Sequence, residues 1–169
     1  MIYIKLPYMP FEPVGGVHTA FDYVLRLNAM AGKTIATILT DSKYLKSWLP
    51  SEYCNVPVRS TFTKVTPHDT LILPEVIASE AAQFPQVKTK ILLVLNWKYV
   101  PSTLTEHDLQ LLGFTNILTN SKFSQTKLRE QFENFPITHI PQVIIPPQNT
   151  EIIPFQKRAQ HSVLILNRK

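Results

Sequence analysis

The stretch EPVGGVHTAFDYVLRLNAMAGKTIATILT, from Glu12 to Thr40, decides the fold. Side chains suited to one helix face recur in it at steps of three and four residues: Val17, Ala20, Phe21, Val24, Leu25 and Asn28. This spacing predicts an amphipathic helix that ends at about Ala31, with Gly32 in the left-handed conformation that caps helices. The run MIYIKL before the helix and the run KTIATILT after it are typical of strands. A βαβ unit with two parallel strands is therefore expected.

The same alternation continues along the chain. The runs NVPVRSTF, DTLILPE, KILLVLN, TNILTNS and ITHIPQVII predict further strands, and their continuous apolar stretches favour a sheet covered on both faces. The runs SKYLKSWL, VIASEAAQF, TEHDLQLLG and SKFSQTKLREQF predict helices, the last two capped by Thr105 and Ser121. We therefore expect a doubly wound, Rossmann-like α/β domain with a mainly parallel sheet of about six or seven strands and helices on both faces.

The predicted domain spans residues 1–145. Residues 146–161 are rich in proline and polar side chains and predict a linker. Residues 162–169, SVLILNRK, form an apolar run that predicts the first strand of a second, missing or truncated domain. An unpaired strand there would favour self-association of the chain.

Composition narrows the function classes. The chain has 169 residues, of which 44% are hydrophobic, and its longest aliphatic run, Ile91 to Leu95, is far shorter than a membrane span. The lone Cys54 fits a reducing compartment, so we expect a soluble, cytoplasmic protein. The net charge of +5 is spread over short basic clusters, which argues against nucleic-acid binding. A solvated surface explains these clusters, and the alternative is a weak attraction to phosphorylated ligands or to anionic lipids at the inner membrane face.

Two of the four glycines in the chain, Gly15 and Gly16, stand side by side in the predicted loop just before the first helix. Backbone without side chains can approach a ligand closely, and free N–H groups at a helix start favour a phosphate or sugar oxygen. The alternative is that the pair only permits a tight turn. The sequence VGGVHT matches neither the dinucleotide fingerprint nor the phosphate-binding P-loop, so no nucleotide cofactor is predicted.

Polar and aromatic residues follow several predicted strands at the edge where doubly wound domains bind ligands. The candidates for substrate binding are Glu75, Asn96, Trp97, Tyr99 and Ser121, together with His18 in the first helical turn. Helix capping by Glu75 or Ser121, packing of the aromatic rings and a surface position for His18 are the ordinary alternatives. The five histidines show no metal-ligand spacing, so no metal site is expected.

The order of motifs resembles one known family. The Gly-Gly loop, DTLILPE, KTKILLVLNWKYV, GFTNILTNSKFSQTKLREQF, ITHIPQVIIPP and SVLILNRK are similar, in this order, to the N-terminal half of retaining glycosyltransferases of family 4, also called group 1. That family has the GT-B fold, in which two Rossmann-like domains face each other across a cleft. The resemblance covers nearly the whole chain and rests on the succession of motifs.

The resemblance implies transfer of a sugar from a nucleotide-sugar donor to a glycan or lipid-linked acceptor held by the N-terminal domain. It places Gly15 and Gly16 against the donor diphosphate and sugar, and Glu75, Asn96 and Tyr99 near the transferred sugar and the acceptor. It places Arg168 and Lys169 on the donor phosphates. No metal or other cofactor is implied.

Two departures from the family pattern limit the expectation. The paired-glutamate motif of the donor domain is absent from the chain, and the strand of DTLILPE ends in Pro74-Glu75 where many relatives have a histidine. We therefore expect the 169 residues alone to be inactive in sugar transfer. The alternative is a stand-alone, non-catalytic Rossmann-like module that binds a phosphorylated sugar or a partner protein. A flavodoxin-like domain would need a hydroxyl-rich or acidic phosphate loop, which VGGVHT does not provide.

Overall fold

The computed structural model describes residues 1–7, 15–41, 49 and 51–141. The strands in this part of the chain are β1 (Ile2–Lys5), β2 (Ala36–Leu39), β3 (Val58–Arg59), β4 (Thr70–Pro74), β5 (Thr89–Val94), β6 (Phe114–Thr119) and β7 (Ile137–His139). The α-helices are α1 (Gly15–Ala31), α2 (Glu106–Leu111) and α3 (Lys122–Gln131), and the 3-10 helices are η2 (Ser51–Tyr53), η3 (Glu75–Gln83) and η4 (Trp97–Tyr99).

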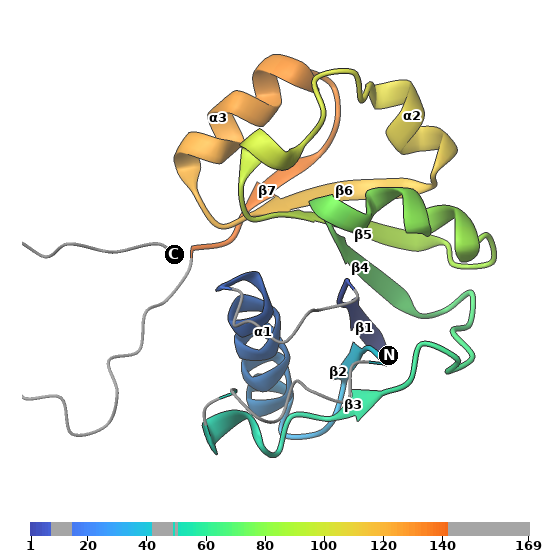
Figure 1. Cartoon of the computed structure of the whole chain (residues 1–169), viewed down its shortest axis with the longest axis vertical. Coiled ribbons are helices and arrows are strands. Elements are labelled where there is room, and N and C mark those ends of the chain that lie inside the picture. Colours follow the sequence, from blue (N-terminus) through green and yellow to red (C-terminus); the bar gives the residue numbers. More distant parts are fainter. Residues whose placement is uncertain (8–14, 42–48, 50, 142–169) are drawn as a thin grey trace, which may run out of the picture.

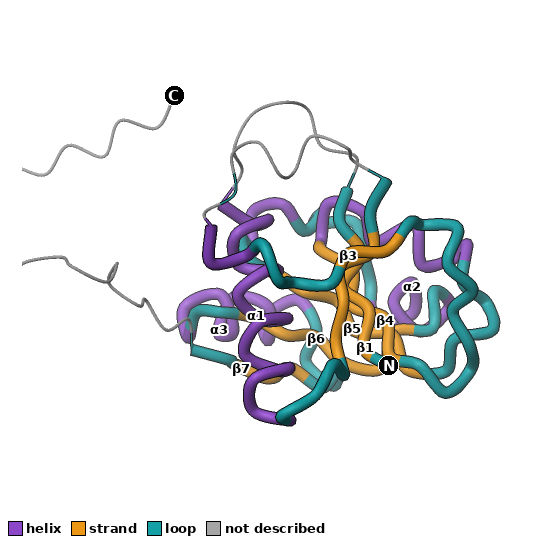
Figure 2. The backbone as a smooth tube through the Cα atoms, turned by 90° about the horizontal axis from the view of Figure 1, so that it is seen from below, coloured by secondary structure: helices purple, strands orange, loops and turns teal. Residues whose placement is uncertain are grey.

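The seven strands form one sheet in the order β3-β2-β1-β4-β5-β6-β7, and every neighbouring pair is parallel. Figure 1 shows α1 on one face of this sheet and η3, α2 and α3 on the other, with β3 and β7 at its two edges (Figure 2). The predicted Rossmann-like, doubly wound α/β fold is confirmed. The strand order reverses between β1 and β4, and this switch point is where such sheets bind ligands.

The core lies on both faces of the sheet because successive side chains of a strand point to opposite sides. In β4, Leu71 and Leu73 pack under η3, α2 and α3, while Ile72 packs with α1 on the other face. Leu92 and Leu93 of β5 divide in the same way. The prediction that the central apolar strands are covered on both faces is confirmed.

The turn from α1 into β2 depends on Asn28. Its side-chain oxygen accepts hydrogen bonds of 2.8 Å from the backbone N–H groups of Ile35 and Ala36, and its amide donates to the Ala36 carbonyl at 2.9 Å. Gly32 has a φ of 62°, the left-handed conformation predicted for it. Asn28 therefore stands on the helix face toward β2 because its side chain fixes the turn between α1 and β2.

Some element boundaries differ from the prediction. Gly15 and Gly16 are the first two residues of α1, whereas the sequence placed them in the loop before it. The run VIASEAAQF lies in the 3-10 helix η3, which is broken at Ile77 by a non-helical backbone. In the run ITHIPQVII the described strand is only β7, at Ile137–His139.

Several predictions fall outside the described residues. These are nearly all of SKYLKSWL, the linker at 146–161, the final strand at 162–169, and Arg168 and Lys169. Within the described ranges, none of the helices has the length and apolar character needed to cross a membrane.

Candidate functional site

The candidate site lies where the start of α1 meets the carboxyl ends of the central strands. Gly16 is the second residue of α1, Glu75 comes directly after β4, and Leu95 and Asn96 come directly after β5. Contacts among these residues join three segments that are far apart in the sequence. We call the set of Gly16, Glu75, Leu95 and Asn96 the switch-point junction.

Gly16 is closely approached by another side chain in this junction. A Cβ atom on Gly16 would lie 3.1 Å from Cδ1 of Leu95, which is tighter than nearly all real contacts of a Cβ atom. Gly16 lies inside α1, so its backbone conformation is open to any residue. The absence of a side chain therefore lets the start of α1 approach the end of β5, and the first N–H groups of the helix lie at this edge of the sheet.

Glu75 is the acidic group of the junction and is 8% exposed. Its Oε1 accepts a hydrogen bond of 3.0 Å from the N–H of Asn96, and its Oε2 accepts a longer one of 3.4 Å from the N–H of Leu95. Burial raises the pKa of Glu75 above its ordinary value, and the backbone N–H donors oppose this effect only in part. A carboxyl group that keeps its proton to higher pH can donate a hydrogen bond to a ligand oxygen.

Asn96 and Trp97, two candidate residues that follow β5, make structural contacts of their own. The side-chain oxygen of Asn96 accepts a hydrogen bond of 3.1 Å from the N–H of Lys98 and caps η4. Trp97 is half-buried against the core, and its ring meets that of Phe123 in α3 edge to face, with 6.3 Å between ring centroids. Tyr99 is 63% exposed.

Ser121 and His18 make ordinary structural contacts. The hydroxyl of Ser121 accepts a hydrogen bond of 3.4 Å from the N–H of Ser124 and caps α3, which is the alternative that the sequence left open. The ring of His18 lies edge-on to that of Tyr53 in η2, at 6.0 Å between centroids. The structure thus brings Glu75 and Asn96 together and connects them to Gly16 through Leu95. It gives Ser121 and His18 capping or packing contacts of their own.

Lys5 is a charged residue that the sequence analysis missed. It ends β1, is 7% exposed, and its Nζ lies 2.5 Å from Oε2 of Glu80 in η3. A lysine within the apolar run IYIKL, in a strand covered on both faces, was the available signal, because buried cations are almost always paired. This ion pair connects the end of the central strand β1 to η3.

Among the described residues, no group of three or more His, Cys, Asp or Glu side chains is arranged to hold a metal ion. Comparison of the chain with protein-family models, with curated proteins and with solved structures finds no match. The function is therefore argued from the fold and from the switch-point junction.

Proposed function

We propose that this chain is the acceptor-side domain of a retaining glycosyltransferase of the GT-B type, in which it would face a donor-binding domain. Support comes from the doubly wound parallel sheet and from a polar site at its switch point, where such sheets hold ligands. The motif order given above supports the same proposal.

The observation that carries the proposal is the switch-point junction. The start of α1 lies against the end of β5 at Gly16, which has no side chain. The buried carboxyl group of Glu75 is hydrogen-bonded to the end of the same strand. Helix N–H groups attract phosphate or sugar oxygens, and a carboxyl group with a raised pKa suits a sugar hydroxyl. Neither contact needs a metal ion or a cofactor on this domain.

Sugar transfer also needs cations or N–H donors at the leaving diphosphate, because negative charge develops there. In the proposed arrangement the facing domain supplies half of these groups. The 169-residue chain is then expected to bind sugars without transferring them.

Saturation-transfer NMR on the 169-residue chain tests the proposal with neutral hexoses, hexose phosphates and a nucleotide-sugar. We expect at least one sugar to bind with a dissociation constant of about 1 mM, and Gly16→Val to weaken this binding about tenfold. The matched control is Gly32→Asn at the other end of α1, where nothing lies within 4 Å of an added Cβ and asparagine tolerates the positive φ.

Circular dichroism checks that both variants fold. Failure of every sugar to bind would contradict the proposal. Turnover of a radiolabelled nucleotide-sugar by this chain alone would contradict the need for a facing domain.

A further inference from the structure

Exposed hydrophobic side chains follow several strands at the edge of the sheet that holds the switch-point junction. Large exposed side chains follow the carboxyl ends of four successive strands, from β3 to β6: Phe62, Val76, Tyr99 and Phe123. Single exposed apolar residues need no explanation, whereas a contiguous patch marks a binding surface. The half-buried ring of Trp97 and the exposed ring of Phe123 are in contact, and Tyr99 belongs to the same turn of η4 as Trp97.

Polar contacts hold the backbone of η4, which carries Trp97 and Tyr99. Asn96 caps η4 through the N–H of Lys98. The side-chain amide of Gln131 in α3 donates to the carbonyls of Pro101 and Leu104, at 2.9 and 3.0 Å, and so fastens the segment after η4 to α3. Backbone that is held in this way loses little conformational entropy when a ligand binds.

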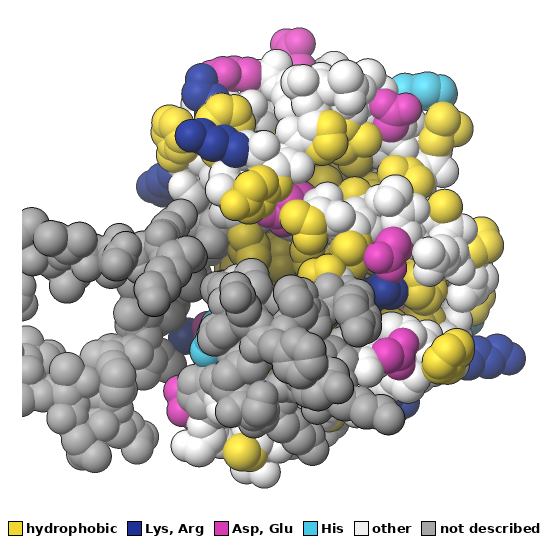
Figure 3. Space-filling view, viewed as in Figure 1, with side chains coloured by type: hydrophobic (Ala, Val, Ile, Leu, Met, Phe, Trp, Pro, Cys, Tyr) yellow, Lys and Arg dark blue, Asp and Glu magenta, His cyan; other side chains and the backbone are white. Residues whose placement is uncertain are grey.

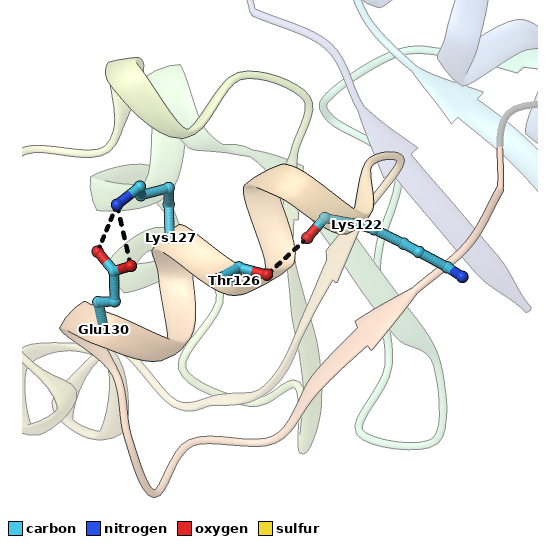
Figure 4. A network of polar contacts seen from close by, with 4 residues as sticks. All are labelled: Lys122, Thr126, Lys127 and Glu130. Atoms are coloured by element: carbon cyan, nitrogen blue, oxygen red, sulfur yellow. Dashed lines mark hydrogen bonds and ion pairs between the residues drawn. The ribbon is translucent and has the colours of Figure 1, made fainter.

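Two lysines are sequence neighbours of these aromatic residues. Lys98 in η4 and Lys122 in α3 are exposed, and the first turns of both helices contain no acidic residue. Within the described ranges neither lysine ammonium group has an ion-pair partner, whereas Lys127 in the same helix is paired with Glu130 at 2.8 Å. Figure 4 shows the Lys122 side chain extending away from the Lys127–Glu130 pair. Hydrophobic and basic side chains also lie side by side over this end of α3 (Figure 3).

We infer that Trp97, Tyr99, Phe123, Lys98 and Lys122, here called the aromatic–basic surface, bind an acceptor sugar that carries a phosphate or carboxylate group. The electron-rich face of an aromatic ring attracts the partly positive C–H groups of a pyranose ring. The positive charges of Lys98 and Lys122 complement the charge of its anionic group. The inference rests on the proposed function and narrows its acceptor to an anionic sugar.

The position of the surface fits this assignment. Asn96 caps η4 with its side chain and donates its backbone N–H to Glu75, so one residue connects the aromatic–basic surface to the switch-point junction. A sugar on the aromatic rings would then lie next to the site proposed for transfer.

Tryptophan fluorescence gives a direct test because the chain has only two tryptophans, and Trp48→Phe leaves Trp97 as the single reporter. The probes are a hexose 6-phosphate, the neutral hexose, inorganic phosphate, and vesicles of mixed anionic and neutral phospholipid. We expect the hexose phosphate to change the Trp97 signal saturably, and to bind about tenfold more tightly than the neutral hexose or inorganic phosphate.

Matched variants in the same background complete the test. Phe123→Ala and the double variant Lys98→Ala with Lys122→Ala should each weaken hexose phosphate binding about tenfold. Lys127→Ala on the same helix and Phe62→Ala, an aromatic residue that is 91% exposed after β3, should leave binding unchanged. Equal losses in the control variants would overturn the inference.

Two further outcomes would overturn it. The first is vesicle binding without hexose phosphate binding, which would make the surface a membrane contact. The second is sugar binding in the NMR experiment that Gly16→Val weakens and the lysine and Phe123 variants do not. In that case the proposed function stands and only the aromatic–basic surface fails.

Discussion

The backbone N–H of Asn96 donates a hydrogen bond of 3.0 Å to the carboxyl group of Glu75, across the ends of β5 and β4. The same carboxyl group accepts from the N–H of Leu95 at 3.4 Å. A buried side chain at the switch point thereby satisfies N–H groups that the end of β5 leaves without partners in the sheet. The acidic group that the proposed function assigns to sugar binding therefore also holds the ends of β4 and β5 together.

Glu75 makes stability depend on pH in a defined direction. Burial raises its pKa above the ordinary value of 4.5, so the folded protein keeps this proton to higher pH than the unfolded chain does. The contribution of the protonated carboxyl group is therefore fully present below about pH 4.5 and is lost as the pH rises through the folded pKa. Glu75→Gln should flatten this decline in the free energy of unfolding. Urea unfolding at a series of pH values measures it, and an unchanged slope in the variant would contradict the prediction.

The contact between Gly16 and Leu95 predicts a coupling between two substitutions. In the wild-type chain, Gly16→Ala forces the end of the Leu95 side chain to move, which should cost about 1 kcal/mol and offset the gain in helix propensity. In a Leu95→Ala background the obstacle is gone, and Gly16→Ala should stabilise the protein by about 0.5 kcal/mol. Unfolding of the four variants in urea gives the coupling energy. The same effect of Gly16→Ala in both backgrounds would show that Leu95 is irrelevant to it.

Local features of the fold could be predicted from the sequence. Thr105 accepts from the N–H of Asp108 at 3.1 Å and Asp108 in turn accepts from the N–H of Thr105, so the expected cap of α2 is a reciprocal capping box. Ser121 likewise caps the start of α3, and Gly32 follows the end of α1 in the left-handed conformation, both as expected. These features depend on residues within a few positions of one another, where side-chain chemistry decides the backbone.

Contacts between distant residues could not be predicted. Glu75 and Leu95 are 20 residues apart, and only the register of β4 against β5 brings them together. The sequence indicated the edge of the sheet at which Glu75 and Asn96 lie, but not that the Asn96 side chain caps η4. Leu95 was not predicted as a site residue, because an aliphatic side chain after a strand gives no chemical indication of such a role. Its role follows from packing against Gly16.

The Lys5–Glu80 pair predicts an asymmetry between single and double substitutions. Glu80→Gln leaves the Lys5 ammonium group buried without a counter-charge and should destabilise the protein by about 1–3 kcal/mol, because Glu80 is only partly exposed. Adding Lys5→Met replaces the buried cation by an apolar chain of similar length, so the double variant should recover part of this loss. Urea unfolding of the three variants is the measurement. A double variant that is less stable than Glu80→Gln alone would contradict the prediction.

Gly113 is expected to be the most sensitive glycine of the described chain, for two reasons that can be separated. Its φ of 79° is strained for other residues, and an added Cβ would lie 3.2 Å from Nζ of Lys90. That buried ammonium group donates hydrogen bonds of 2.9 Å to the carbonyls of Ala81 and Leu112, which tie β5 to η3 and to the residue that follows α2.

Comparison with Gly32 isolates the lysine contact. Gly32 has a φ of 62° and nothing within 4 Å of an added Cβ, so Gly32→Ala should cost only the backbone strain, about 1 kcal/mol. Gly113→Ala should cost about 1 kcal/mol more, because Lys90 must shift and weaken its two hydrogen bonds. Urea unfolding compares the two variants. Equal losses of stability in Gly113→Ala and Gly32→Ala would mean that Lys90 moves aside freely. In a Lys90→Met background the additional loss for Gly113→Ala should be smaller, because a thioether donates no hydrogen bond to the carbonyls.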